Sequence, residues 1–180
     1  HKINDPAKLH STLWALAAFC LTASAGYVIN DILDRENDKR HPAKRNRPIA
    51  SGAVSLPAAL GALLTLILCA GAILFFKLNA KFAAVLGLYF VMTFAYSIDL
   101  KRRLIVDVLT LAGLYTLRLI AGGVAAGVPV SPWLMALSMF LFLSLAFAKR
   151  YSELLITGVE NEPIAGRNYA LDDLHMIESV

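Results

Sequence analysis

The segment LPAALGALLTLILCAGAILFF, residues 56–76, contains no charged residue and decides the fold class. A helix needs about 20 apolar residues to cross roughly 30 Å of hydrocarbon, so a run of this length is typical of a membrane span. A core helix of a soluble protein would carry polar residues at every third or fourth position, and this run does not. Residues 119–148 likewise contain no charged residue. The chain is therefore expected to lie in a membrane.

Further apolar segments flank this one, so that five spans are expected in all. They lie at residues 9–29, 56–76, 82–98, 104–125 and 132–148. Composition agrees, because 58% of the 180 residues are hydrophobic and only 17% are charged, against about a quarter charged in a soluble domain. The short connection at 77–81 predicts an antiparallel pair of helices. Gly122, Gly123 and Gly127 are expected to let helices pack closely. The predicted fold is all-α, a polytopic membrane helical bundle that forms a single domain over residues 1–180.

The two ends of the chain predict an incomplete protein. Residues 1–6 form a polar stretch with no initiator methionine and no signal-peptide pattern. Residues 151–173 are largely polar, and residues 174–180 are interpreted as the start of a further span. We expect a piece of a longer membrane protein, incomplete at both ends.

Lysine and arginine are distributed unequally between the two sides of the predicted membrane domain. The connections after the first, third and fifth spans carry twelve of them, and the opposite side carries four. Basic residues are enriched on the cytoplasmic side of membrane proteins. The charged connections are therefore expected at the cytoplasmic face of the cell (inner) membrane, and no nucleic-acid partner is expected.

The connection after the first span, NDILDRENDKRHPAKRNRPIASG at residues 30–52, mixes acidic residues with basic ones. Asp31, Asp34 and Asp38 stand at positions i, i+3 and i+7, so on a helix they share one face. Asn30 lies one turn before Asp34, whereas Glu36 points away. Three carboxylates on one face repel one another unless a cation sits between them. Magnesium takes oxygen ligands and bridges carboxylates to substrate phosphates, so we interpret this acidic face as a magnesium site.

The alternative is that each aspartate pairs with a nearby arginine or lysine in a solvated loop. The acidic face continues an apolar span at the membrane surface, and this position favours the metal. Basic residues follow directly in sequence, among them Lys44, Arg45 and Arg47. Arginine suits bidentate phosphate contacts and lysine acts as a point charge. Carboxylates and cations together predict a clamp for a phosphate or diphosphate.

Two charged residues fall within the fourth predicted span. Arg118 lies near its middle, where an unpaired charge costs at least about 2.5 kcal/mol. Asp107 lies about 16 Å away by helical rise, so the two side chains are expected to meet other partners. Arg118 has two open interpretations, contact with a substrate phosphate or a structural ion pair. For Asp107 we favour a place in the site over a role at the helix N-terminus.

The remaining charged connections offer further candidates. The basic run at 101–103 is interpreted as a topology determinant rather than a ligand. Lys149 and Glu153 are one helical turn apart, so a surface ion pair is the default. Together with Arg150 they lie on the predicted side of the acidic face, which makes donor binding the alternative. Tyr151 lies near the boundary where aromatic residues are enriched in any case.

The pattern Asn-Asp-x-x-Asp-x-x-x-Asp at 30–38, followed by the pair Arg47 and Pro48, resembles the signature of the UbiA-type intramembrane prenyltransferase superfamily. The resemblance extends over almost the whole chain, which is similar to the second to sixth of the family's nine helices. It implies an all-helical fold with a lipid-accessible cavity whose polar end is cytoplasmic. It also implies that Asp31, Asp34 and Asp38 bind magnesium with the diphosphate and serve as catalytic residues.

The sequence motifs of this chain differ from those of the family members that use an aromatic acceptor, and the differences indicate another branch of the family. Those members have Arg-Thr-x-x-Arg-Pro, whereas this chain has Ala43 and Lys44 at the first two positions. Their second Asp-x-x-x-Asp motif is missing. The blocks HPAKR at 41–45 and KRYSEL at 149–154 are similar to the decaprenyl-phosphate phosphoribosyltransferase branch. This similarity implies transfer of a 5-phosphoribosyl group from phosphoribosyl diphosphate to a polyprenyl phosphate.

The resemblance thus implies Mg²⁺ as cofactor, a polyprenyl lipid and a phosphorylated or diphosphate co-substrate as partners, and membrane lipid around the protein. The nearest alternative moves a polyprenyl group from its diphosphate to an aromatic acceptor such as 4-hydroxybenzoate. A non-catalytic transporter or lipid-binding protein is disfavoured, because Arg118 alone is placed deeply in a span. The candidate substrate-binding residues are Asn30, Lys44, Arg45, Arg47, Asp107, Arg118, Lys149, Arg150, Tyr151 and Glu153.

Overall fold

The computed structural model describes residues 6–42 and 44–160. Its helices are α1 (Pro6–Leu33), α2 (Arg35–Arg40), α3 (Leu56–Lys77), α4 (Ala80–Ile98), the 3₁₀ turn η1 (Leu100–Arg102), α5 (Leu104–Ala126) and α6 (Pro132–Glu160). Five of them are long and apolar enough to cross a membrane, namely α1, α3, α4, α5 and α6. The prediction of an all-α polytopic membrane bundle is confirmed. The expected start of a further span at 174–180 lies outside the described residues.

Two helices extend beyond the predicted spans at the charged end of the bundle. α1 continues past residue 29 to Leu33, and α6 continues past residue 148 to Glu160. The predicted spans were bounded by the first polar or charged residues. A helix ends where its backbone hydrogen bonds end and not at the first polar residue, and in the α6 extension Lys, Arg and Glu are good helix formers. Both extensions therefore carry charged residues beyond the apolar spans on rigid helix.

Local sequence sets the helix ends at the opposite side of the bundle. The Asn79 side chain accepts a hydrogen bond from the Phe82 N–H at 2.9 Å and caps α4. Gly127 ends α5 in the left-handed conformation, with φ 61°, which glycine adopts without steric cost. These caps turn the chain back into the bundle within a few residues.

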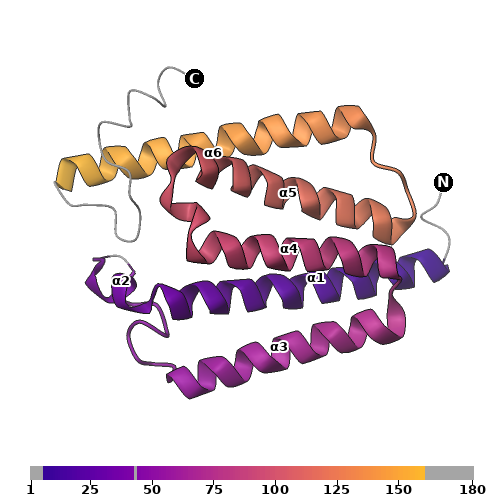
Figure 1. Cartoon of the computed structure of the whole chain (residues 1–180), viewed down its shortest axis with the longest axis horizontal. Helices are drawn as coiled ribbons and strands as arrows, with labels where there is room; N and C mark the ends of the chain where they lie inside the picture. Colours follow the sequence, from indigo (N-terminus) through magenta and orange to yellow (C-terminus); the bar gives the residue numbers. More distant parts are fainter. Residues whose placement is uncertain (1–5, 43, 161–180) are drawn as a thin grey trace.

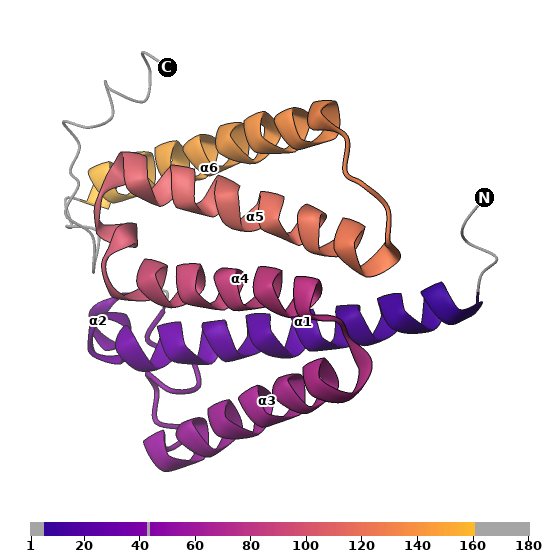
Figure 2. The same cartoon turned by 45° about the vertical axis from the view of Figure 1, so that its right-hand side comes forward.

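The long helices stand side by side in one row, in the order α3, α1, α4, α5, α6 (Figures 1 and 2). α1 contacts α3 on one side and α4 and α5 on the other, and α5 packs against α6. α3 and α4 run in opposite directions, as the short connection at 77–81 predicted, but α1 lies between them. The first span of the chain thus becomes a central helix, which places its charged end among the later elements.

Small residues of α1 allow this central packing. Ala15 and Ala18 are buried against the aromatic and aliphatic side chains of α4 and α5, among them Phe82, Leu86 and Leu114. Large apolar side chains such as those of Phe75, Trp133 and Phe140 are instead strongly exposed. Exposed apolar side chains on every long helix are compatible with lipid rather than water around the bundle.

Glycines contribute to packing in only some of the predicted places. A Cβ atom at Gly123 would lie 2.5 Å from Cγ2 of Val130, but Val130 belongs to the connection between α5 and α6, so Gly123 allows a close turn of the chain and not a close approach of two helices. The prediction is wrong for Gly122 and Gly127, where a Cβ atom would have no neighbour within 4 Å. Gly127 is required by its backbone conformation instead, and Gly122 borders open space.

Gly26 marks a close approach of α1 to α4 that the sequence did not indicate. A Cβ atom there would lie 2.6 Å from Cγ2 of Thr93. We expect Gly26→Ala to lower the free energy of unfolding by about 1–3 kcal/mol through overpacking, measured by thermal or denaturant unfolding of the full-length protein in detergent. Gly61→Ala is the matched control, since nothing lies within 4 Å of its Cβ position. Equal stability of the two variants would contradict the expectation.

Candidate active site

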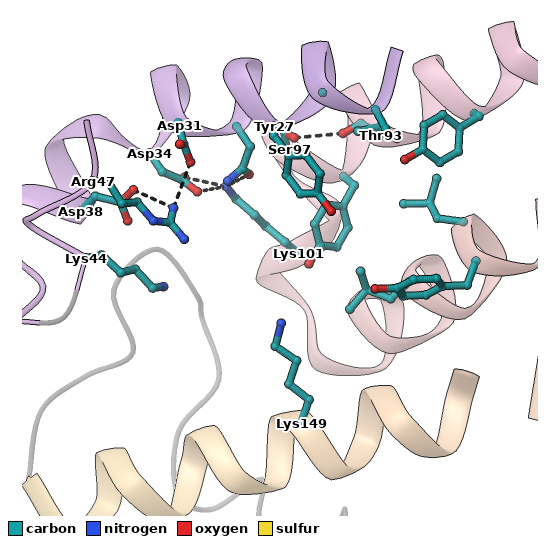
Figure 3. Close-up of a pocket in the computed structure, with 18 of the residues that line it drawn as sticks. Tyr27, Asp31, Asp34, Asp38, Lys44, Arg47, Thr93, Ser97, Lys101 and Lys149 are labelled. Atoms are coloured by element: carbon teal, nitrogen blue, oxygen red, sulfur yellow. Dashed lines mark hydrogen bonds and ion pairs between the residues drawn. The ribbon is translucent and has the colours of Figure 1, made fainter. Parts of the chain in front are cut away.

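A polar cavity of about 260 Å³ lies at the charged end of the bundle, between α1, α4, α5 and α6 (Figure 3). Most of the residues singled out from the sequence line it. These are Asn30, Asp31, Asp34, Asp38, Lys44, Arg47, Arg118, Lys149 and Arg150. Arg45, Asp107, Tyr151 and Glu153 are not among its lining residues. Segments that are distant in the sequence therefore meet around one polar space.

The three aspartates share one face, as their spacing predicted. Asp34 lies between α1 and α2 but keeps a helical backbone, with φ −87° and ψ −1°. Its N–H donates to the Asn30 carbonyl and its carbonyl accepts from the Asp38 N–H, both at 2.8 Å. The helical hydrogen-bond pattern thus continues through the junction, and Asp31, Asp34 and Asp38 all border the cavity.

Glu36 behaves as the sequence predicted and stays outside the cavity. Its side chain is 67% exposed and accepts a hydrogen bond from Lys39 at 2.8 Å. This bond lowers the pKa of the Glu36 carboxyl below its usual value. Glu36 is therefore a surface ion-pair residue on the same segment, turned away from the acidic face.

Arg47 bridges two of the three aspartates. Its Nη1 lies 3.0 Å from Oδ1 of Asp31 and 2.9 Å from Oδ2 of Asp38. The Asp38 side chain is almost fully buried, whereas that of Arg47 is 38% exposed. The guanidinium thus separates two carboxylates that would otherwise repel each other and remains accessible from the cavity.

Lys101 neutralises the third aspartate, a contact that its interpretation as a topology determinant did not include. Its Nζ lies 2.5 and 2.6 Å from the two carboxylate oxygens of Asp34 and donates to the Asn30 side-chain oxygen at 3.1 Å. The Lys101 side chain is only 8% exposed, because η1 turns it inward. Its neighbours Arg102 and Arg103 are exposed. No local pattern in the run at 101–103 distinguishes the one inward residue from the other two.

These pairings test both interpretations of the acidic face. The alternative of nearby basic partners holds for Asp31 and Asp38, which pair with Arg47 of the following connection. It does not hold for Asp34, whose partner Lys101 is 67 residues away. Within residues 6–42 and 44–160, no three Asp, Glu, His or Cys side chains converge closely enough to enclose one metal ion. Magnesium commonly binds one or two carboxylates and completes its shell with water and phosphate. The carboxylates and the Asn30 amide fit an ion held in that way.

A buried ion pair joins α4, α5 and α6 beside the cavity, which Arg150 lines and Asp107 does not. Arg150 on α6 is 1% exposed and pairs through Nε with Asp107 on α5, which is fully buried. Tyr96 on α4 donates to Oδ1 of Asp107 at 2.8 Å. Glu153 pairs with Arg150 rather than with Lys149, so the default surface pair is wrong. The sequence carries no signal for Tyr96 in this network, because a tyrosine near the end of a span is expected at the membrane boundary in any case.

Lys149 stands next to this pair and projects from α6 toward the acidic face (Figure 3). Arg118 lies at the apolar end of the cavity, where it contacts Tyr89 and Tyr115. As predicted from their separation, Asp107 and Arg118 have different partners. The cavity thus has an acidic wall, a basic wall and one cation at its inner end.

Comparison with known proteins identifies the family. Residues 3–158 match the model of the UbiA prenyltransferase family. This chain belongs to the UbiA prenyltransferase family. The sequence-based resemblance is therefore confirmed, and the acidic face of α1 and α2 corresponds to the motif that carried it.

Proteins similar to this chain carry different names. The chain is 36% identical over 168 residues to nodulation protein NoeC of Azorhizobium caulinodans, covering 92% of this chain and 54% of that protein. It is 40% identical over 140 residues to decaprenyl-phosphate phosphoribosyltransferase of Mycolicibacterium smegmatis, which covers 78% of this chain and 44% of that protein. It is 35% identical over 136 residues to 4-hydroxybenzoate octaprenyltransferase of Xylella fastidiosa, which covers 72% of this chain and 44% of that protein. The chain thus spans about half the length of these relatives.

Proposed function

We propose that this UbiA family protein is a magnesium-dependent membrane transferase that moves a 5-phosphoribosyl group from phosphoribosyl diphosphate to a polyprenyl phosphate such as decaprenyl phosphate. The observation that carries the proposal is the single cavity in which a three-aspartate face meets Lys44, Arg47, Lys101 and Lys149. The relative from Mycolicibacterium smegmatis supports the choice of substrates. We also place this cavity on the cytoplasmic side of the inner membrane, following the distribution of basic residues.

The transfer needs little proton chemistry from the protein. An oxygen of the acceptor phosphate forms a bond to the anomeric carbon, and the bond from that carbon to the diphosphate breaks, with its electron pair leaving on the diphosphate. The attacking phosphate oxygen is already deprotonated at neutral pH, so no general base is required. The residues act by positioning the two substrates and by stabilising charge on the leaving group.

The acidic face would hold the metal through Asp31, Asp34 and Asp38. Bound magnesium supplies charge neutralisation for the departing diphosphate. Arg47 and Lys101 pair with the same carboxylates, so both cations would lie beside a diphosphate held at the acidic face and could donate to its oxygens.

A second candidate keeps the fold and the acidic face but uses a prenyl diphosphate as donor and an aromatic acceptor such as 4-hydroxybenzoate. The similarity to the octaprenyltransferase of Xylella fastidiosa favours it. The residues at 43 and 44, Ala and Lys in place of Arg and Thr, weigh against it. A cavity rich in cations on two walls also suits a donor that carries phosphate at both ends.

An assay with two substrate pairs tests the proposal. Membranes carrying the full-length protein receive either labelled phosphoribosyl diphosphate with decaprenyl phosphate, or labelled prenyl diphosphate with 4-hydroxybenzoate. We expect lipid-linked label from the first pair only, and we expect chelation of magnesium by EDTA to abolish it, with recovery when magnesium is restored in excess. Product from the second pair alone would establish the alternative, and product from neither would exclude both.

A further inference from the structure

Arg118 is a cation in the middle of α5 with no carboxylate partner in the part of the chain that the structure describes. Its Nη2 donates to the Tyr89 hydroxyl at 3.1 Å, and its guanidinium carbon lies 4.7 Å from the centre of the Tyr115 ring. Its Nε is buried and has no hydrogen-bond partner among the described residues. Tyrosine hydroxyls and rings compensate a charge within a membrane span only in part. An anionic group that is not part of these helices is therefore the fitting partner.

A second cavity, of about 420 Å³, meets the polar one at this residue. Ala23, Tyr27 and Arg118 line both cavities. The rest of the second cavity is lined mainly by small or apolar residues of α1 and α5, such as Phe19 and Gly122. Arg118 thus stands at the junction of a polar space and an apolar one, which is the arrangement that an amphiphile with an anionic head requires.

We propose that Arg118 binds the phosphate of a polyprenyl monophosphate whose first isoprene units occupy the apolar cavity. A monophosphate ester carries between one and two negative charges at neutral pH and offers three acceptor oxygens, which suit a guanidinium fork. The assignment rests on the proposed function, because it gives the acidic face to the diphosphate donor and the inner end to the lipid acceptor. Arg118 then distinguishes a phosphorylated lipid from a neutral one.

The spacing of cavity residues along α1 is compatible with a donor at the acidic face and a lipid acceptor at the inner end. Tyr27 and Ala23 precede Asp31 by one and two helical turns, which is about 6 and 12 Å by helical rise. A donor whose diphosphate lies at the acidic face would therefore extend its sugar toward Arg118. The acceptor phosphate would reach the anomeric carbon from the side opposite the leaving group.

Binding of two lipids with the same chain tests the proposal. Decaprenyl phosphate and decaprenol are bound to the full-length protein in nanodiscs, without donor or magnesium, and their affinities are measured by competition with labelled decaprenyl phosphate. We expect the wild type to prefer the phosphate. Arg118→Gln should weaken phosphate binding about 10- to 100-fold, the range of a lost charge-assisted hydrogen bond, and leave decaprenol binding unchanged. Arg118→Lys should recover part of the preference.

A second pair of variants tests the place of the chain. Gly122→Leu puts a side chain into the open space of the apolar cavity, so it should weaken binding of both lipids equally. Gly61→Leu is the matched control, because that glycine on α3 also has open space but lines neither cavity. Unchanged decaprenol binding by Arg118→Gln also verifies that the variant is folded.

Three results would overturn the proposal. The first is that Arg118→Gln still prefers decaprenyl phosphate over decaprenol. The second is that Gly122→Leu binds each lipid as tightly as the wild type does. The third is that phosphatidic acid competes as strongly as decaprenyl phosphate, which would indicate an ordinary phospholipid site. Because donor and magnesium are absent, the outcome is separate from turnover. Lost preference in Arg118→Gln supports the lipid site even if no phosphoribosyl group is transferred. Transfer with an unaltered preference refutes the lipid site and leaves the proposed function standing.

Discussion

Replacement of Asp34 by asparagine is expected to lower the transfer rate by at least about 100-fold at saturating substrate. The substitution keeps the shape of the side chain and removes the charge that a metal would bind. A metal ion contributes several kcal/mol of charge stabilisation to a transfer of this kind, and each 1.36 kcal/mol corresponds to about tenfold in rate. The rate is measured as lipid-linked label formed by the full-length protein in membranes.

Glu36→Gln is the matched control for Asp34→Asn. Glu36 lies on the same short segment and loses the same charge, but its side chain is exposed and pairs with Lys39 away from the cavity. We expect this variant to retain wild-type rate within about twofold, because exposed ion pairs contribute little. Equal loss in both variants would mean that the general charge of the segment, rather than the acidic face, supports activity.

Replacement of Arg150 by methionine is expected to lower the free energy of unfolding by about 3–5 kcal/mol. The change leaves the fully buried Asp107 carboxylate without its guanidinium partner, and removal of one member of a buried pair costs about this much. Tyr96 still donates one hydrogen bond to Asp107 and offsets only part of the loss. Denaturant unfolding of the full-length protein in detergent measures the effect.

Two comparisons separate this effect from general disturbance of α6. Lys149→Met removes a neighbouring charge that is exposed, and its stability should stay within about 0.5 kcal/mol of the wild type. The double variant Asp107→Asn with Arg150→Met should regain part of the lost stability, since no unpaired charge remains buried. If the double variant were as unstable as the sum of the single ones, the pair would not act as a unit.

The sequence by itself determined the membrane bundle and the acidic face. Uninterrupted apolar runs such as 56–76 identify spans because the thickness of hydrocarbon fixes the number of residues needed. The spacing of Asp31, Asp34 and Asp38 identifies a shared face because helical periodicity is local and holds through the Asp34 junction. Both properties depend on neighbours within a few turns, so they can be predicted without knowing how the helices pack.

Only the tertiary structure decided which charges meet. Lys101 faces Asp34 because α1 lies between α3 and α4, an order that connection lengths alone do not specify. Asp107 pairs with Arg150 because α5 packs against α6. Arg118 instead opens onto two cavities. Helix packing brings together charges that are 43 residues apart in one pair and 67 residues apart in the other. Helix packing depends on the fit of side chains across several helices, so no local pattern in the sequence predicts these pairs.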